Sequence, residues 1–309
     1  MQAFLVVLPI FIMVGIGWGL HCSGLLSERT LREDNVILYW FAMPAILLQG
    51  ILGADMEVVG DAGFVAAVCL PYFVTTYIVW ATCHKGEPDN RRFAVLSMSA
   101  ARGNHFFVGI PVIHLAMGPS GVAVGTIILA VSIFIMQVVS IGSGQFAMFG
   151  SPSWASLRAT LFQLFFKTPP FMACLVGLTL AATGYSMPNW LAATVRILAD
   201  ISTGMALISL GGRLKMRDMV HALSVWKIAA FKLVVHPVIA WLIFTLFRLP
   251  TEMVQAGVIL SAMPVAVNTA IIAQEVGMDT DYCGMGIAVT TVLSTLSLPI
   301  WIRALGLAQ

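Results

Sequence analysis

Long apolar runs separated by short polar connections recur along the whole chain. A run of about 20 apolar residues is long enough to cross the hydrocarbon core of a bilayer as one helix. The pattern therefore predicts ten membrane-spanning helices, at residues 1–20, 36–53, 62–83, 92–116, 121–149, 165–183, 190–210, 224–247, 253–276 and 282–304. Composition agrees, because 59% of the 309 residues are hydrophobic and only 10% are charged, whereas a soluble domain carries about 25% charged residues. We expect an all-α, multi-pass protein of the plasma or inner cell membrane.

Basic residues are distributed unevenly among the connections. Those after the first, third, fifth and seventh segments hold ten, with Lys227 and Lys232 just beyond, and the opposite side holds two. Because basic loops remain in the cytoplasm, the chain is predicted to have both termini outside. The ten are Arg29, Arg32, Lys85, Arg91, Arg92, Arg158, Lys167, Arg213, Lys215 and Arg217, and the two are Arg248 and Arg303.

Residues of the first half recur in the second half at a nearly constant spacing. An odd number of helices in each half would place the two halves in opposite orientations, as in the inverted repeats of many secondary transporters. We predict five-helix repeats at 1–149 and 165–309, joined by a cytoplasmic linker at 150–164. The matching pairs include Pro9 and Pro170, Ser99 and Ser261, and Asn104 and Asn268, which are separated by 161, 162 and 164 residues.

Two of the apolar segments contain polar residues and helix breakers near their middles. Segment 92–116 holds Arg102-Gly103-Asn104-His105 followed by Gly109 and Pro111, and segment 253–276 holds Pro264 and Asn268. A broken helix leaves backbone N–H and C=O groups that must find partners inside the membrane. Breaks at matching depths in two halves are typical of the binding site of a secondary transporter.

These motifs resemble those of the auxin efflux carrier family. Asn104-His105-Phe106-Phe107-Val108-Gly109-Ile110-Pro111 is similar to the family's Asn-x-x-Phe-x-Gly-x-Pro signature. The stretches Met263–Asn268 with Ala273-Gln274, and Ser294–Pro299, resemble its ninth and last helices. The large cytoplasmic loop of plant carriers is absent here. The chain is therefore similar to compact prokaryotic-type members, which carry small carboxylates such as malate and malonate.

The resemblance implies a definite architecture. Ten helices would form a 5+5 inverted repeat in which the broken helices 4 and 9 cross, a fold like that of bile acid sodium symporters. Helices 1, 2, 6 and 7 would form a scaffold, and helices 3–5 and 8–10 a transport domain that moves against it as an elevator.

Five polar residues are predicted to contact the substrate. Arg102 would either clamp a carboxylate or have a structural role, in an ion pair or as the cap of a carbonyl end, because a mid-membrane arginine needs a polar cavity or an acidic partner. The two asparagines would contact solute or only cap the broken helices. The five are Arg102, Asn104, His105, Gln137 and Asn268.

Other residues are expected to have local or coupling roles. Gly103, Gly109, Pro111 and Pro264 would shape the crossover. His105 would be either a proton carrier or a neutral, hydrogen-bonded side chain. Asp200 would either pair with Arg196 or take part in proton coupling. With so few intramembrane acids, proton coupling or uniport is favoured over sodium coupling, and we expect no metal or other cofactor.

The function predicted from these patterns is secondary transport of a small organic anion: a monocarboxylate, a dicarboxylate or an auxin-like acid. The expected partners are that anion and the lipid bilayer, with no nucleic acid, and a homodimer is left open. A receptor or channel-like conduit on the same scaffold is the alternative. A remote one is an intramembrane serine protease, suggested by Gly118-Pro119-Ser120-Gly121.

Overall fold

The computed structural model describes residues 2–53, 61–150, 158, 162, 168–185, 187–212 and 225–307. Within these ranges the regular structure is helical, which confirms the all-α prediction, and the single pairing of extended backbone joins Gly103 to Val265. Most of the predicted linker at 150–164 lies outside the described residues.

The first half of the chain contributes α1 (Gln2–Cys22), α2 (Glu28–Ile37), η1 (Leu38–Ala42), α3 (Met43–Leu52), α4 (Ala62–Cys83), η3 (His84–Gly86), α5 (Asn90–Ser99), η4 (His105–Gly109) and α6 (Ile110–Phe149). The second half contributes α8 (Pro169–Ala182), α9 (Asn189–Gly212), α10 (Trp226–Ala230), η6 (Phe231–Val235), α11 (His236–Leu246), α12 (Thr251–Ser261), α13 (Thr269–Val276) and α14 (Thr280–Ala304).

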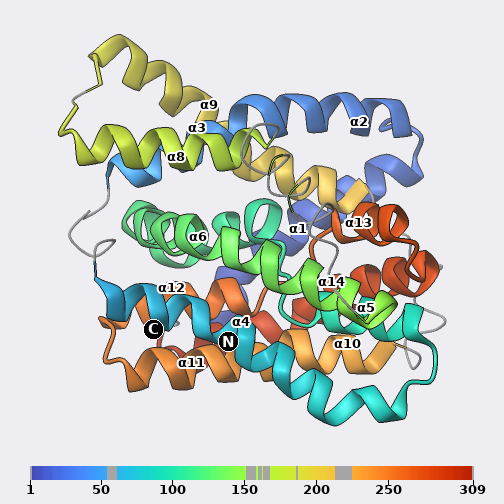
Figure 1. The fold of residues 1–309 in the computed structure, drawn as a ribbon. Coiled ribbons are helices and arrows are strands. Elements are labelled where there is room, and N and C mark those ends of the chain that lie inside the picture. Colours follow the sequence, from blue (N-terminus) through green and yellow to red (C-terminus); the bar gives the residue numbers. More distant parts are fainter. Residues whose placement is uncertain are drawn as a thin grey trace.

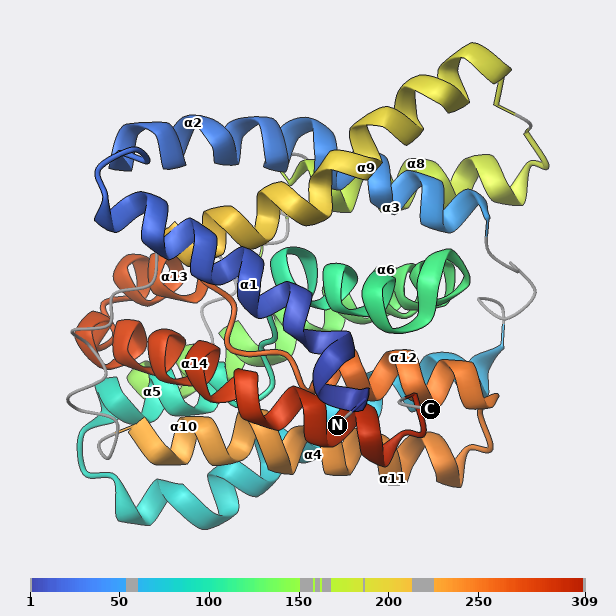
Figure 2. The ribbon, with the colours of Figure 1, turned by 180° about the vertical axis from the view of Figure 1, so that it is seen from behind.

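The helices form two groups on either side of α6 (Figures 1 and 2). On one side lie α2, α3, α8 and α9, with α3 packed against both α8 and α9. On the other side lie α4, α10, α11 and α12, with α11 packed against α4 and α12. Helix α1 packs along α9 and also touches α14.

Six of the described helical stretches are long and apolar enough to cross a membrane: Glu28–Leu52, Ala62–Gly86, His105–Phe149, Asn189–Gly212, Trp226–Leu246 and Thr280–Ala304. This finding confirms a multi-pass membrane protein. Pro169–Ala182 is a shorter apolar helix, and the predicted fourth and ninth segments are each divided. Ten crossings and an inverted repeat remain predictions.

The start of the second predicted segment was wrong by eight residues. Helix α2 begins at Glu28, after Ser27 as N-cap, and continues through η1 into α3. The Ser27 side chain accepts a hydrogen bond from the Thr30 N–H. Charged residues in the first turns had suggested a loop, but Arg29 and Glu33 pair at 2.8 Å one helical turn apart. The helix therefore extends beyond its apolar part.

Gly118 divides the long helix α6. At about 1.5 Å per residue, the stretch of η4 and α6 together, which has 45 residues, would as a straight helix be more than twice as long as the hydrocarbon core is thick. Gly118 has φ 70° and ψ −165°, a conformation that suits glycine because it has no Cβ. The interruption lies in the connection predicted between segments 92–116 and 121–149.

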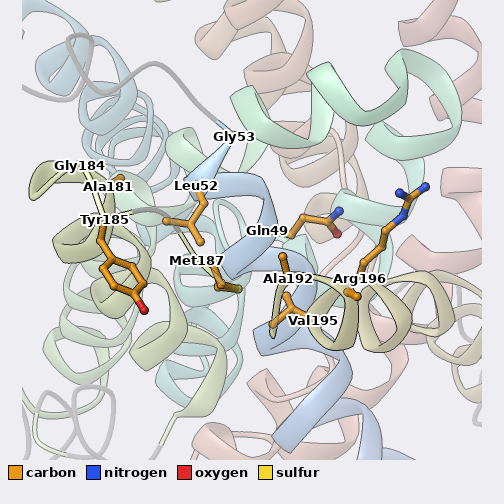
Figure 3. A pocket seen from close by; sticks show the side chains of 11 residues that line it. Gln49, Leu52, Gly53, Ala181, Gly184, Tyr185, Met187, Ala192, Val195 and Arg196 are labelled. Atoms are coloured by element: carbon orange, nitrogen blue, oxygen red, sulfur yellow. The ribbon is translucent and has the colours of Figure 1, made fainter. Parts of the chain in front are cut away.

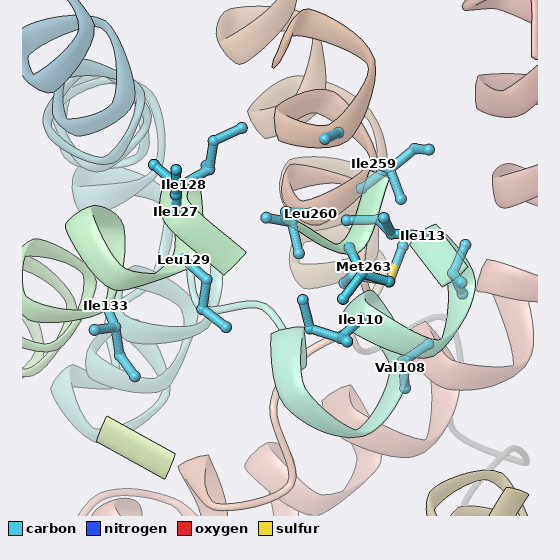
Figure 4. Packing of buried hydrophobic residues seen from close by; sticks show 14 of the residues in the cluster. Val108, Ile110, Ile113, Ile127, Ile128, Leu129, Ile133, Ile259, Leu260 and Met263 are labelled. Carbon is cyan, nitrogen blue, oxygen red and sulfur yellow. The ribbon is translucent and has the colours of Figure 1, made fainter. Parts of the chain in front are cut away.

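Buried aliphatic side chains fix α6 against α12. Ile110, Ile113 and Leu129 of α6 lie in one cluster with Ile259 and Leu260 of α12 (Figure 4). All five are almost completely buried. Because close-packed side chains resist displacement, this cluster holds α12 at a fixed place beside the break that follows it.

Candidate functional site

Two broken helices cross at the centre of the structure. Helix α5 ends at Ser99 and α12 at Ser261, and the chain resumes helical form at His105 and Thr269. Between these ends the two extended stretches run antiparallel and pair through their backbones. The Asn104 N–H donates to the Pro264 carbonyl at 2.8 Å, and the Ala266 N–H donates to the Arg102 carbonyl at 3.2 Å. The predicted breaks and their crossing are thus present.

Arg102 lies at this crossing with its side chain completely buried. Its guanidinium donates to the Gln137 side-chain oxygen, to Ser140 Oγ at 3.2 Å and to Asn268 Oδ1 at 3.4 Å. These partners are neutral, and no acidic side chain pairs with Arg102 among the described residues. The guanidinium Nε has no hydrogen-bond partner there either. A buried cation held only by neutral oxygens retains a strong attraction for an anion.

Lys232 is a second buried basic residue near the crossing. It lies within η6, inside the segment predicted at 224–247, and is completely buried. Its ammonium donates to the carbonyl of Ser261, the last residue of α12. The C-terminal end of a helix carries partial negative charge, which a cation stabilises. Lys232 has no acidic partner among the described residues.

The two predicted asparagines have different local roles. Asn104 caps η4, because its side chain accepts a hydrogen bond from the Phe107 N–H at 3.3 Å. Its Nδ2 is buried and has no partner in the described structure. Asn268 makes no side-chain cap to α13, contrary to one of the expected roles, and instead accepts from Arg102. Each asparagine therefore has a side-chain group beside the crossing.

His105 and the two predicted glycines pack against the end of α12. The His105 ring is buried beside the Leu260 carbonyl, within electrostatic reach of Arg102 and Lys232. A Cβ on Gly103 would lie 2.6 Å from His105 Nε2, and one on Gly109 would lie 2.8 Å from a Leu260 methyl group. A side chain at either position would therefore have to displace these neighbours. Pro111 lies in the first turn of α6, and Pro264 supplies the carbonyl that accepts from Asn104.

Other sequence candidates lie away from this arrangement. Asp200 is exposed on α9 and forms no ion pair with Arg196 in the described structure. Ser120 is exposed, and its hydroxyl donates weakly to the Met117 carbonyl at 3.4 Å. No histidine of the described chain contacts Ser120, so the geometry of a serine protease is not assembled there.

Three polar residues at the crossing were not predicted from the sequence: Lys232, Ser140 and Thr290. The Thr290 hydroxyl accepts from the Val265 N–H at 3.1 Å and so ties α14 to the break after α12. Ser140 and Thr290 also donate to carbonyls one turn earlier in their own helices. Such bonds are common for Ser and Thr in membrane helices. The sequence therefore does not distinguish these two residues from other serines and threonines in the apolar segments.

The N-terminal end of helix α5, which is predicted to face the cytoplasm, is also bonded to the second half of the chain. Arg91 donates to the carbonyls of Gly277 at 3.0 Å and Met278 at 3.3 Å, and Arg92 pairs with Asp279 at 3.1 Å. Partial burial alone would raise the pKa of Asp279, but the Tyr282 N–H and the Arg92 guanidinium outweigh it and lower that pKa below its ordinary value.

Comparison with known proteins identifies relatives along nearly the whole chain. The family described as "Membrane transport protein" matches residues 2–302. An "uncharacterized transporter" of Methanothermobacter thermautotrophicus is 24% identical, with 96% of each chain covered. An "uncharacterized transporter" of Escherichia coli K12 is 23% identical, over 96% of this chain and 95% of its own. A "putative malonate transporter" of Rhizobium meliloti is 24% identical, over 93% of this chain and 91% of its own. These relatives are named as transporters, not as enzymes.

Proposed function

The chain belongs to the membrane transport protein family, the auxin efflux carriers, and from that premise we propose that it carries a small organic anion across the membrane. The substrate would be a carboxylate that binds where the two broken helices cross. One observation carries the proposal: the buried guanidinium of Arg102 is held by neutral oxygens alone among the described residues. An anionic solute would supply the charge that this site lacks.

Further charges and donors support an anion at this place. Lys232 adds a second buried basic side chain near the crossing. The N-terminal ends of η4 and α13 lie beside the crossing, and the partial positive charge of a helix N-terminus favours an anion. Asn104 Nδ2 is a buried donor without a partner in the described structure. The name of the relative from Rhizobium meliloti, a putative malonate transporter, favours a dicarboxylate. One carboxylate could pair with a basic side chain while the other accepts hydrogen bonds from the donors at the crossing.

The burial of Arg102 supports transport by alternating access. A side chain with no exposed surface cannot meet a solute from water unless the protein rearranges. The grouping of α2, α3, α8 and α9 on one side of α6 fits a scaffold against which the crossing helices would move as an elevator. The proposal also includes either proton coupling through His105 or Asp200 or potential-driven uniport. It further includes both termini outside the cell and a homodimer.

Counterflow in proteoliposomes tests the proposal. Vesicles loaded with unlabelled malonate should accumulate labelled malonate transiently and with saturation, because a carrier exchanges one solute for another. A conduit would equilibrate the label without such an overshoot, and a receptor would bind malonate without moving it. Protein-free vesicles are the control. Absence of counterflow with malonate, malate and auxin alike would contradict an organic-anion carrier.

A further inference from the structure

Lys232 differs from Arg102 in how few groups hold its side chain. It is completely buried, in a helical stretch that is long and apolar enough to cross the membrane. Its one hydrogen bond among the described residues is donated to the carbonyl of Ser261, at the end of α12. A helix C-terminus supplies about half a negative charge, which is less than a full counter-ion. A neutral amine can donate the same hydrogen bond, so this contact suits both forms of Lys232.

The elements packed around Lys232 present no acidic side chain to it. Helices α4, α10, α11 and α14 pack against η6, and the end of α12 and His105 of η4 complete its surroundings. Only α12 and α14 of these elements contain acids, and Glu252 and Asp281 are exposed at their starts. Lys232 meets α12 at its end, and η6 meets α14 at Trp301, also near the end. The charged or titratable side chains around Lys232 are Arg102, His105, His236, Lys227 and Tyr72, none of which is negatively charged at neutral pH.

The two histidines within electrostatic reach of Lys232 lack the contacts that a charged imidazole needs. A protonated imidazole has two N–H donors, and each requires an acceptor. Neither ring nitrogen of His105 has a hydrogen-bond partner in the described structure. His236 Nδ1 lies 2.8 Å from Thr75 Oγ1, but its Nε2 has no partner there. Imidazole is also a weaker base than an amine. Of these three bases, Lys232 is therefore the one whose surroundings suit an added proton.

An anion at the crossing would change which form of Lys232 is favoured. A buried ammonium without a counter-ion is unstable, and such a group releases its proton to water unless a negative charge lies nearby. A carboxylate bound beside Arg102 would supply that charge. Arginine cannot respond in the same way, because it keeps its proton in proteins. Arg102 would thus provide the constant charge of the site, and Lys232 the variable one.

From these observations we infer that Lys232 is the proton-coupling group of the carrier. As the anion enters from one side of the membrane, Lys232 Nζ takes a proton from water and an N–H bond forms. When the anion leaves on the other side, that bond breaks and the proton returns to water. A proton therefore crosses with each anion and in the same direction. The inference rests on the proposed function and deepens it, since it assigns the coupled proton to Lys232 rather than to His105 or Asp200.

Proton uptake on malonate binding tests the inference. In weakly buffered detergent solution near neutral pH, a pH indicator should report about one proton taken up for each malonate that the wild type binds. Lys232→Arg, whose charge is permanent, should bind malonate without this uptake. Lys232→Met, which has no charge, should bind malonate about tenfold more weakly and also without uptake. Unchanged melting temperatures should show that each variant is folded.

Two matched variants serve as controls for the uptake. His236→Gln removes a neighbouring base and should keep the uptake. Arg196→Gln removes a positive charge far from the crossing and should keep it too. Arg196 lines a cavity between α3, α8 and α9 that includes none of the residues at the crossing (Figure 3).

Accumulation driven by a pH gradient gives a second measurement. Valinomycin and equal potassium hold the membrane potential of proteoliposomes at zero. Vesicles about one pH unit more alkaline inside should then concentrate labelled malonate about tenfold. Lys232→Arg should still exchange malonate in counterflow but should not concentrate it, because no proton travels with the anion. Protein-free vesicles correct for passive entry of the acid.

The outcomes separate this inference from the proposed function. Malonate counterflow in the wild type without proton uptake would overturn the inference and leave anion transport intact. Uptake that persists in Lys232→Met, or that is lost in His236→Gln, would also overturn it, because another group or malonate itself would then take the proton. Absence of counterflow with malonate, malate and auxin alike would contradict both.

Discussion

The Asn104 N–H and the Pro264 carbonyl, which are 160 residues apart in the sequence, are joined by a hydrogen bond of 2.8 Å. With the bond from Ala266 to Arg102, it pairs the two extended stretches where both helices are broken. Backbone groups that would be costly to leave unpaired inside a membrane thus satisfy each other. The side chains of Arg102 and Asn268 take no part in this backbone pairing and are joined to each other by a hydrogen bond of 3.4 Å.

Replacing Arg102 tests whether it recognises charge. Arg102→Gln should weaken the binding of malonate by about 10- to 100-fold, because a charge-assisted hydrogen bond between the guanidinium and the carboxylate is lost. It should change the affinity for the uncharged malonamide far less. Ligand-induced shifts of melting temperature measure both. An equal loss for both ligands would indicate that Arg102 has a structural role, and the melting temperature without ligand reports whether the variant folds.

The two asparagines should both contribute to binding. Asn104→Ala or Asn268→Ala should abolish the malonate-induced rise in melting temperature, because each loses a polar group at the crossing. Asn104→Ala should also lower the melting temperature without ligand, by removing a helix cap worth about 1 kcal/mol. Asn268 caps no helix, so it serves as the matched control. Unchanged malonate binding in both variants would show that neither asparagine belongs to the binding site.

Lys232 should act on the solute through its charge alone. Lys232→Met keeps most of the side-chain volume and removes the ammonium. Because Coulomb energy scales with the charge of the ligand, the fold-loss for malonate should be about the square of that for monomethyl malonate. Dissociation constants measured by titration in nanodiscs check this. Equal fold-losses for the two ligands would indicate that Lys232 acts by supporting the end of α12 instead.

The ion pair of Arg92 and Asp279 should give a small dependence of stability on pH. The pKa of Asp279 is lower in the folded protein than its ordinary value near 3.8. The contribution of Asp279 to folding stability is therefore complete above pH 3.8, and it is lost as the pH falls through the lower pKa of the folded state. The pair is partly exposed, so the expected loss is under about 1 kcal/mol. Melting temperatures from about pH 6 down to about pH 3 measure it.

Asp279→Asn is the informative variant for this pair. Asparagine keeps an oxygen that can accept from the Tyr282 N–H, as Asp279 does at 2.9 Å, but it lacks the charge. The variant should therefore melt with a smaller acid-dependent decrease than the wild type. An unchanged decrease would assign the acid sensitivity to other carboxylates.

The apolar pattern predicted most helices because polar residues that can cap a helix interrupt the apolar runs near the helix ends. Helix α4 runs over 62–83 as expected, with Asp61 accepting from the Phe64 N–H at its start. The crossover was predictable because charged residues and helix breakers are rare in apolar segments. Gln137 stood out for the same reason, and it contacts Arg102.

Depth along a helix could be read from the sequence, but the face of the helix could not. Lys232 was missed because it lies near the end of its segment, where lysine usually extends to the membrane surface. Here it faces the interior and meets Ser261. Asp200 is the opposite case, since it is midway along its segment but exposed on α9. Which side of a helix is covered depends on tertiary packing, and a single sequence does not encode it locally.

Helix α5 is fastened to the second half of the chain at both ends. Backbone bonds join the break beyond it to the stretch after α12, and Arg91 holds the turn between α13 and α14 by its carbonyls. With two attachment points on different partners, α5 cannot pivot about either one without breaking the other. Any large displacement must therefore carry the crossing, α13 and the start of α14 together, and a solute held there would travel with its binding groups unchanged around it.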